Sequence, residues 1–256
     1  EKLMDAAHLL KNSGVDVLTF PDSPSGRTRA DSILVAEKVA RETGMYVMPH
    51  LCCRDKNAIA IRSQLLGAHI IGINNFLVIT GDPVPSAMRQ SVKSVFNFDS
   101  VGLMNIIDSM NQEFFSSSPI VFGGAINQNR LNLDVEIMRV KKKIASGASF
   151  FLTQPAFTKK SIDNLKIIKK ETDACILCGI MPLVSKKNAL FMKNEMTGID
   201  VPDEIVERYD SSMTKEEGEN TGIAIAREIM NMASFCDGYY FSFPFNRVYM
   251  LKKIME

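Results

Sequence analysis

Polar residues with the means to do chemistry stand where several short apolar runs of this chain end. They are His50 in MYVMPHL, Asp82 in ITGDP, Gln154 in LTQP and Arg247 in PFNR. An imidazole hydrogen-bonds or packs on a ring system, an amide offers a donor and an acceptor to a heterocycle, and a guanidinium is a planar fork for anions. A carboxylate can stabilise a positive charge that develops during a reaction. These types favour a small-molecule site.

Each of these residues also has a structural interpretation. An aspartate in Gly-Asp-Pro is natural in a turn or at a helix cap. Gln154 can be a buried amide bonded to backbone, and Pro155 biases it toward extended geometry in either case. His50 can be satisfied locally, and Arg247 can form a surface salt bridge.

The elements that must position these residues alternate regularly. Seven apolar runs, each bounded by polar, Pro or Gly residues, indicate strands at Val15–Phe20, Met45–Leu51, Phe76–Pro83, Ile120–Asn127, Phe150–Pro155, Cys175–Pro182 and Gly238–Asn246. Segments of helical period lie at Lys2–Lys11, Asp31–Arg41, Ala58–Leu66, Leu103–Met110, Asp134–Ala145, Lys160–Lys170, Lys187–Asn194, Asp203–Tyr209 and Thr221–Ser234. This alternation predicts a parallel sheet with crossover helices.

Length and alternation together predict an α/β fold, a (β/α)8 TIM barrel formed by residues 1–256 as one domain. In such a barrel chemistry collects at the carboxyl ends of the strands, so PHL, TGDP, TQP, GIMP and FNR are expected to face one pocket. The chain opens with a helix and shows seven strands rather than eight. We therefore expect the first strand upstream of Glu1, in a longer chain.

Composition excludes several classes of function. Lys plus Arg number 30 and Asp plus Glu 29, so no overall field attracts nucleic acid or an anionic membrane. No apolar stretch approaches the roughly 18–20 residues of a membrane span, and we expect a soluble, cytoplasmic protein. Lys215–Asn220 (KEEGEN) is expected to be a charged surface loop or helix end.

Cysteine and the remaining histidines favour structural roles. The cysteine count of five is odd, which favours reduced thiols over a disulfide framework. Cys175 and Cys178 lie three apart in a strand pattern, where they face opposite sides, so packed thiols are favoured over metal or redox chemistry. His8 and His69 lie in helical patterns and are assigned to structure.

At its strand ends the chain resembles the methylenetetrahydrofolate reductase family. The likeness is carried by Met48–Leu51 (MPHL), Ile79–Pro83 (ITGDP), Leu152–Pro155 (LTQP), Gly179–Pro182 (GIMP) and Pro244–Arg247 (PFNR), in the family's order and spacing. It is closest to the reductase half of bifunctional homocysteine methyltransferase–methylenetetrahydrofolate reductases, notably through HLCCRDKN (His50–Asn57).

The resemblance implies an FAD enzyme that reduces 5,10-methylenetetrahydrofolate to 5-methyltetrahydrofolate, a tetrahydrofolate substrate, with NADH or NADPH as donor. It also implies a homo-oligomer and admits a fused homocysteine methyltransferase domain. By similarity, Asp82 is the catalytic residue, stabilising the cationic iminium form of the folate. The family draws the proton for folate ring opening from a glutamate on the first barrel strand, which we expect upstream of this sequence.

Further residues are assigned through the same resemblance. The implied substrate-binding residues are Gln154, Thr19, Tyr209 and Arg247. The implied cofactor-binding residues are His50, Thr80, Gly81, Asp82, Ala125, Lys142 and Lys143. The chain departs from the family at Ile126, which replaces an aromatic residue, and it lacks the GxGxxG fingerprint, which this family does not use.

Two alternatives remain open. The first is a pterin-binding barrel that hands a methyl group to a partner and binds folate without FAD. The second is a non-enzymatic relative that retains the barrel. Flavin absorption of the purified protein distinguishes the reductase from both.

Overall fold

The computed structural model describes all 256 residues. They form two compact units. The first unit comprises Glu1–Gly124 and Lys142–Ser149, and the second comprises Ala125–Lys141 and Phe150–Glu256. Strand β4 (Val121–Ile126) and helix α5 (Leu133–Ala145) each run from one unit into the other.

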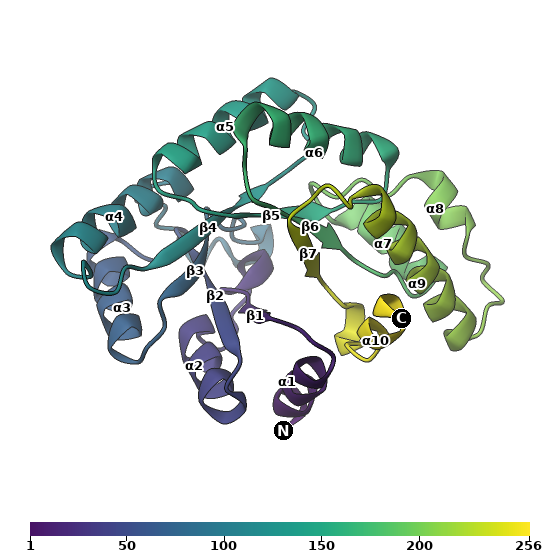
Figure 1. Ribbon diagram of the computed structural model, residues 1–256, viewed down its shortest axis with the longest axis horizontal. Coiled ribbons are helices and arrows are strands. Elements are labelled where there is room, and N and C mark those ends of the chain that lie inside the picture. The colour runs from purple at the N-terminus through teal and green to yellow at the C-terminus, as the bar shows by residue number, and fades with distance from the viewer. The chain divides into compact units, whose positions relative to one another are not determined.

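The first unit is built from parallel strands joined by helices. Its strands are β1 (Val17–Phe20), β2 (Tyr46–Cys52), β3 (Asn75–Ile79) and the start of β4, and each pairs in parallel with the next. Its helices are α1 (Lys2–Asn12), α2 (Ser32–Thr43), α3 (Ala58–Ile70) and α4 (Ser100–Glu113). Figure 1 shows α2, α3 and α4 along one face of these strands.

The helices of this unit follow from sequence signals. The side chain of Asp31 caps α2 by accepting hydrogen bonds from the amides of Ile33 and Leu34, and the helix ends at Gly44 with φ of 70°. The buried side chains of α4 recur at helical spacing and are fully covered, at Leu103, Met104, Ile107 and Met110. Capping and the apolar stripe thus set where these helices lie.

The second unit repeats the same design. Its strands are β5 (Phe151–Pro155), β6 (Ile176–Ile180) and β7 (Gly238–Phe241), again paired in parallel in chain order. Its helices, besides most of α5, are α6 (Lys159–Thr172), α7 (Lys186–Glu195), α8 (Asp203–Glu207), α9 (Lys215–Met232) and α10 (Met250–Met255).

Short 3₁₀ turns follow strands in both units. They are η1 (Pro24–Gly26) after β1, η2 (Ser86–Met88) after β3 and η3 (Pro244–Asn246) after β7.

Helix α9 packs closely on the segment after β6. A Cβ atom at Gly222 would lie 1.8 Å from the carbonyl oxygen of Leu183, and one at Gly218 would lie 2.5 Å from that of Val184. Only glycine permits this approach at either position. The contact fixes the start of α9 beside the start of α7.

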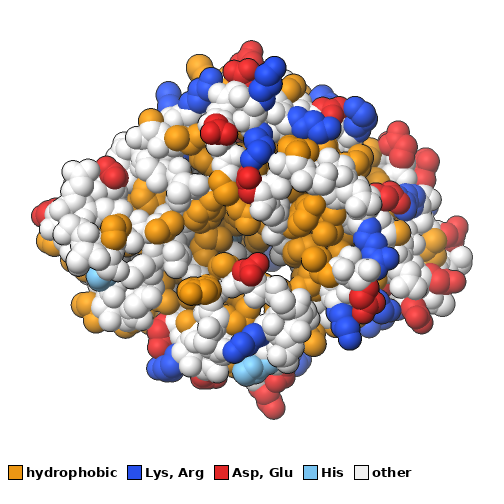
Figure 2. Space-filling model, in the orientation of Figure 1, with side chains coloured by type: hydrophobic (Ala, Val, Ile, Leu, Met, Phe, Trp, Pro, Cys, Tyr) orange, Lys and Arg blue, Asp and Glu red, His pale blue; other side chains and the backbone are white.

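Each of the seven predicted segments contains a strand, and the pairings β1–β2, β2–β3, β3–β4, β5–β6 and β6–β7 are parallel. Strands β3 and β7 end earlier than predicted, at Ile79 and Phe241, because the polar and Pro residues that follow belong to turns. The α/β class is therefore confirmed. The structure contains seven strands, so the eighth strand of a closed barrel stays a prediction. Charged side chains of both signs are interspersed on the face seen in Figure 2, and no helix is both long and apolar enough to cross a membrane.

Of the two alternatives for Lys215–Asn220, a surface loop or a helix end, the structure shows the helix end. The segment is the first part of α9, which begins earlier than the predicted Thr221. Thr214 caps the helix by accepting from the amide of Glu217, while the Glu217 carboxylate accepts from the amide of Thr214. This capping box offsets the low helix propensity of Gly218.

Candidate functional site

In the first unit, His50 lies on β2 with its ring buried. Its backbone carbonyl accepts a hydrogen bond of 2.9 Å from the Ser32 hydroxyl, and its side chain is 8% exposed. Nε2 has no hydrogen-bond partner in the chain. Burial lowers the pKa of His50 to about 4 against the opposing charge of Asp22, so the ring is neutral near pH 7. A neutral imidazole with an unused buried nitrogen is suited to a ligand.

The Thr80–Asp82 turn follows β3 and is fixed by its backbone. The Thr80 hydroxyl accepts from the amide of Ser100 at 3.2 Å, and the Thr80 carbonyl accepts from the amide of Cys53 at 3.2 Å. Gly81 has φ of 91°, and a Cβ there would lie 3.0 Å from that of Cys52. Glycine is therefore required for this turn.

Asp82 is exposed at the end of that turn. Its Oδ2 accepts a hydrogen bond of 2.7 Å from the amide of Ser25, in the loop after β1. The carboxylate thus joins two loops instead of capping a helix. Its Oδ1 remains available to a positively charged group.

Arg54 organises these loops, and the sequence analysis missed it. Its side chain is 2% exposed and donates to the carbonyls of Ser23 at 3.0 Å and Asp82 at 3.1 Å. The same guanidinium forms two hydrogen bonds, 2.7 and 2.6 Å long, with Asp55 and holds the pKa of that carboxyl below its usual range. The guanidinium therefore fixes the loops after β1 and β3 from one point.

Asp22 is a second residue that sequence reasoning missed. Its Oδ2 accepts from the amide of Cys52 at 3.1 Å and lies 3.3 Å from Nζ of Lys56. Its side chain is 10% exposed. Thr19 lies three residues before Asp22. It is half-buried on β1, where it is in register with Met48 of β2.

The predicted lysines lie on α5. Lys142 is exposed, whereas Lys143 is only 4% exposed and has an interaction partner within the chain. A buried ammonium group requires such compensation. Ala125 is half-buried on β4, and the neighbouring Ile126 is fully buried.

In the second unit, Gln154 lies near the end of β5. It is half-buried, and its side-chain amide forms no hydrogen bond within the chain. Its backbone carbonyl accepts from Gln128 Nε2 at 2.8 Å and from the Thr153 hydroxyl at 2.8 Å. The backbone is therefore fixed while the amide stays available to a ligand.

Gln128 supports that position from the loop after β4. Its side chain is fully buried, its own carbonyl accepts from Asn164 at 2.7 Å, and its Oε1 has no partner. The same loop is held by buried Glu136, which accepts from the amide of Asn127 and pairs with Arg130 at 2.8 Å. No sequence spacing indicated these contacts.

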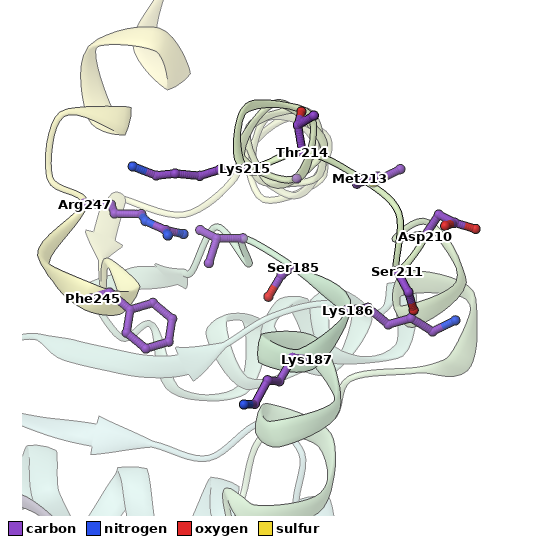
Figure 3. A pocket seen from close by; sticks show the side chains of 12 residues that line it. Ser185, Lys186, Lys187, Asp210, Ser211, Met213, Thr214, Lys215, Phe245 and Arg247 are labelled. Atoms are coloured by element: carbon purple, nitrogen blue, oxygen red, sulfur yellow. The ribbon is translucent and has the colours of Figure 1, made fainter.

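The other two predicted residues of this unit lie in different surroundings. Tyr209 is 1% exposed, donates its hydroxyl to the Leu183 carbonyl at 3.0 Å, and has its pKa raised by burial. Arg247 lies just after η3, 3.2 Å from Glu219, and lines a pocket (Figure 3). Arg247 thus forms a salt bridge, as its structural interpretation expected, and also lines a pocket. Tyr209 is a core residue.

Cysteine and histidine surroundings agree with structural roles. All five cysteines are free thiols; Cys178 is buried on β6, and Cys175, which directly precedes β6, is exposed. His69 stacks on Phe115 with a centroid distance of 4.4 Å. No group of three or more His, Cys, Asp or Glu side chains is placed to hold a metal ion.

Parallel strands followed by helices, with polar side chains at their carboxyl ends, define an α/β protein whose candidate sites lie at those ends. The chain is similar in fold to a crystal structure of 2,3-dimethylmalate lyase, a PEP mutase/isocitrate lyase superfamily member. The TM-score is 0.54 at 12% identity, covering 98% of this chain and 76% of the other.

Residues 1–240 match the family model of methylenetetrahydrofolate reductase, and the chain therefore belongs to that family. Relatives named 5,10-methylenetetrahydrofolate reductase include one from Buchnera aphidicola subsp. Schizaphis graminum, 24% identical over 79% of this chain and 68% of its own length. Another, from Salmonella typhimurium, is 23% identical over 78% of this chain and 64% of its own.

Proposed function

We propose that this protein reduces 5,10-methylenetetrahydrofolate to 5-methyltetrahydrofolate, with FAD as cofactor and NADH or NADPH as donor. Family membership and the names of the relatives support this reaction. One hydride goes to the exocyclic carbon of the folate and one proton to N10 as the five-membered ring opens. The nicotinamide is oxidised in the same overall reaction.

The observation that carries the flavin assignment is the unpartnered Nε2 of buried His50. A buried ring nitrogen without a partner in the chain is available for a polar contact with a cofactor. When bound, FAD supplies the hydride chemistry. His50, Thr80 and Gly81 would hold it, Lys142 and Lys143 would face its phosphates, and Ala125 is a further predicted contact.

Asp82 has the chemistry to stabilise the cation formed on the folate. Opening of the folate ring leaves a positively charged iminium, and a fixed carboxylate beside it lowers the energy of that state. The amide of Ser25 and the guanidinium of Arg54 hold the aspartate in place through its side chain and its backbone, respectively. Preorganisation of this kind avoids rearrangement during the reaction.

Gln154 and Arg247 are proposed to recognise the substrate. The amide of Gln154 is unpaired and offers a donor and an acceptor to the pterin edge. Arg247 offers a planar donor fork to an anionic group. Thr19 remains a predicted contact, whereas Tyr209, with its hydroxyl bonded in the core, is the weakest member of the predicted set.

The proposal is tested by anaerobic spectroscopy of the full-length protein with FAD. Flavin absorbance should bleach on addition of NADH or NADPH and recover on addition of methylenetetrahydrofolate. A protein that binds folate but retains no FAD would contradict the proposal and favour the methyltransferase alternative. Binding of neither ligand would favour a non-enzymatic relative.

Two variants sharpen this test. Asp82→Asn should slow recovery with the folate by roughly 100-fold while bleaching by the nicotinamide persists. Gln154→Ala should raise the KM for the folate with a smaller effect on bleaching. Asp16→Asn is the matched control, because exposed Asp16 precedes β1 at the opposite end of the strand.

Four further features of the protein stay predictions under the same proposal. They are the closed eight-stranded barrel in a single domain, assembly into a homo-oligomer, a fused homocysteine methyltransferase domain, and a cytoplasmic location. Size-exclusion chromatography with light scattering would measure the oligomeric state.

A further inference from the structure

Two cysteines that the proposed reaction does not use lie together in the second unit. Cys178 is fully buried on β6, and Cys236 is half-buried just before β7 begins. Their side chains are hydrogen-bonded to each other. Cys175, which shares the CxxC spacing with Cys178, is exposed and lies outside β6. The fold thus gives Cys178 a thiol partner that is distant in the sequence.

The backbone around the two thiols is fixed by strand pairing. Strands β6 and β7 are parallel, with Cys178 in register with Tyr239. Just before β7, the Asp237 amide donates to the Ile176 carbonyl at 2.9 Å, and the Asp237 carboxylate accepts from the Ile176 amide at 2.7 Å. Paired strands lie about 4.8 Å apart, and Cys236 directly precedes Asp237. The hydrogen-bonded backbone therefore holds Cys236 close to β6.

The two thiols differ in charge environment. The hydrogen bond with Cys178 lowers the pKa of Cys236, and the ammonium of Lys169 adds to this effect against burial and the charge of Asp237. Lys169 is held there by its ion pair with the Asp237 carboxylate. The same hydrogen bond, together with burial, raises the pKa of Cys178. Cys236 is therefore the thiolate-forming member of the pair, and Cys178 is the protonated donor.

We propose that Cys236 is an oxidation site, where a small peroxide forms a sulfenic acid that Cys178 converts into a Cys178–Cys236 disulfide. A partly exposed thiol beside a cationic group and a second cysteine has the surroundings of a redox-sensitive cysteine. Because Cys178 is fully buried, the peroxide reaches Cys236 first. The order of the two steps follows from this difference in exposure.

Both steps balance with hydrogen peroxide as the oxidant. The Cys236 thiolate attacks one peroxide oxygen, the O–O bond breaks, and the departing oxygen takes up a proton and leaves as water. The Cys178 sulfur then attacks the sulfenic sulfur, the S–O bond breaks, and the hydroxyl leaves as a second water with the proton of the Cys178 thiol. The two sulfurs lose two electrons in total, which reduce the peroxide. A dithiol reductant reverses the disulfide by exchange.

The test is peptide mapping of the reduced full chain after treatment with one equivalent of hydrogen peroxide. Trypsin releases Glu171–Lys186, which carries Cys175 and Cys178, and Glu228–Arg247, which carries Cys236. Mass spectrometry without reductant should show these two peptides joined, with the loss of two hydrogen atoms, and dithiothreitol should separate them. Cys175→Ser is the matched control and should keep the link, whereas Cys178→Ala should abolish it.

A second measurement traps the intermediate. In Cys178→Ala the sulfenic acid is not consumed, so dimedone should label Cys236 about tenfold more than in the wild type. The absence of a joined peptide pair in the wild type would overturn the proposal. Loss of the link in Cys175→Ser would also overturn it, because Cys175 would then be the partner, and this result does not depend on the folding of Cys178→Ala. Neither measurement uses flavin or folate, so both are independent of the reductase assay.

Discussion

The guanidinium of Arg54 donates a hydrogen bond of 3.1 Å to the backbone carbonyl of Asp82, which is 28 residues away in the sequence. It also binds the Ser23 carbonyl and the Asp55 carboxylate. One buried side chain thus fixes the backbone on which the proposed catalytic carboxylate is carried. The position of Asp82 depends on a residue that touches no reacting atom.

Arg54→Lys should destabilise the protein by about 2–3 kcal/mol, because an ammonium cannot replace the fork that serves three partners. Urea denaturation measures this change. Arg62→Lys is the control: Arg62 and its partner Glu113 are 36% and 53% exposed, so its effect should stay within about 1 kcal/mol. Equal losses in the two variants would show that Arg54 does not hold the loops.

His50 should make stability depend on pH between about 4 and 6.5. In this window the unfolded chain takes up a proton that the folded chain refuses, so the free energy of unfolding falls as the pH falls. The loss should approach roughly 3 kcal/mol at the acidic end. Urea denaturation of His50→Gln at several pH values should give a flatter profile than the wild type. An unchanged slope would rule out His50 as its source.

Gly81→Ala should destabilise the protein by at least about 1 kcal/mol, because the residue has φ of 91° and the new Cβ would meet Cys52. Gly67→Ala is the matched control. Gly67 lies within α3, where a Cβ meets nothing within 4 Å, so alanine should stabilise the helix by about 0.5–1 kcal/mol. Thermal unfolding of the two variants should therefore shift in opposite directions.

Tyr209→Phe should separate a core role from a ligand-binding role. The loss of the hydrogen bond to the Leu183 carbonyl should cost about 1 kcal/mol of stability, because that carbonyl is left without its buried donor. The KM for the folate should not change. A raised KM with unchanged stability would instead favour contact between Tyr209 and the substrate.

The sequence by itself determined the order and type of the elements from α1 to β7. It did not predict α10 (Met250–Met255), and it placed the ends of β3 and β7 several residues too late. Periodicity is a local property, so strands such as Tyr46–Cys52 and helices such as Ser32–Thr43 could be predicted from neighbouring residues alone. Local signals left Lys215–Asn220 open between a loop and a helix end, and the capping box of Thr214 and Glu217 makes it the start of α9. The capping residues are present in the sequence, but a charged, glycine-containing stretch is equally typical of a loop.

Only the tertiary structure decided which residues support the candidate sites. Arg54 and Gln128 bind backbone carbonyls that lie 28 and 26 residues away, and Asp22 binds an amide 30 residues away. Every residue has a backbone carbonyl, and every residue except proline has a backbone N–H group. A side chain that binds the backbone therefore leaves no pattern of side-chain types in the sequence. These contacts form when parallel strands bring their following loops together, and only then do the individual residues acquire their roles.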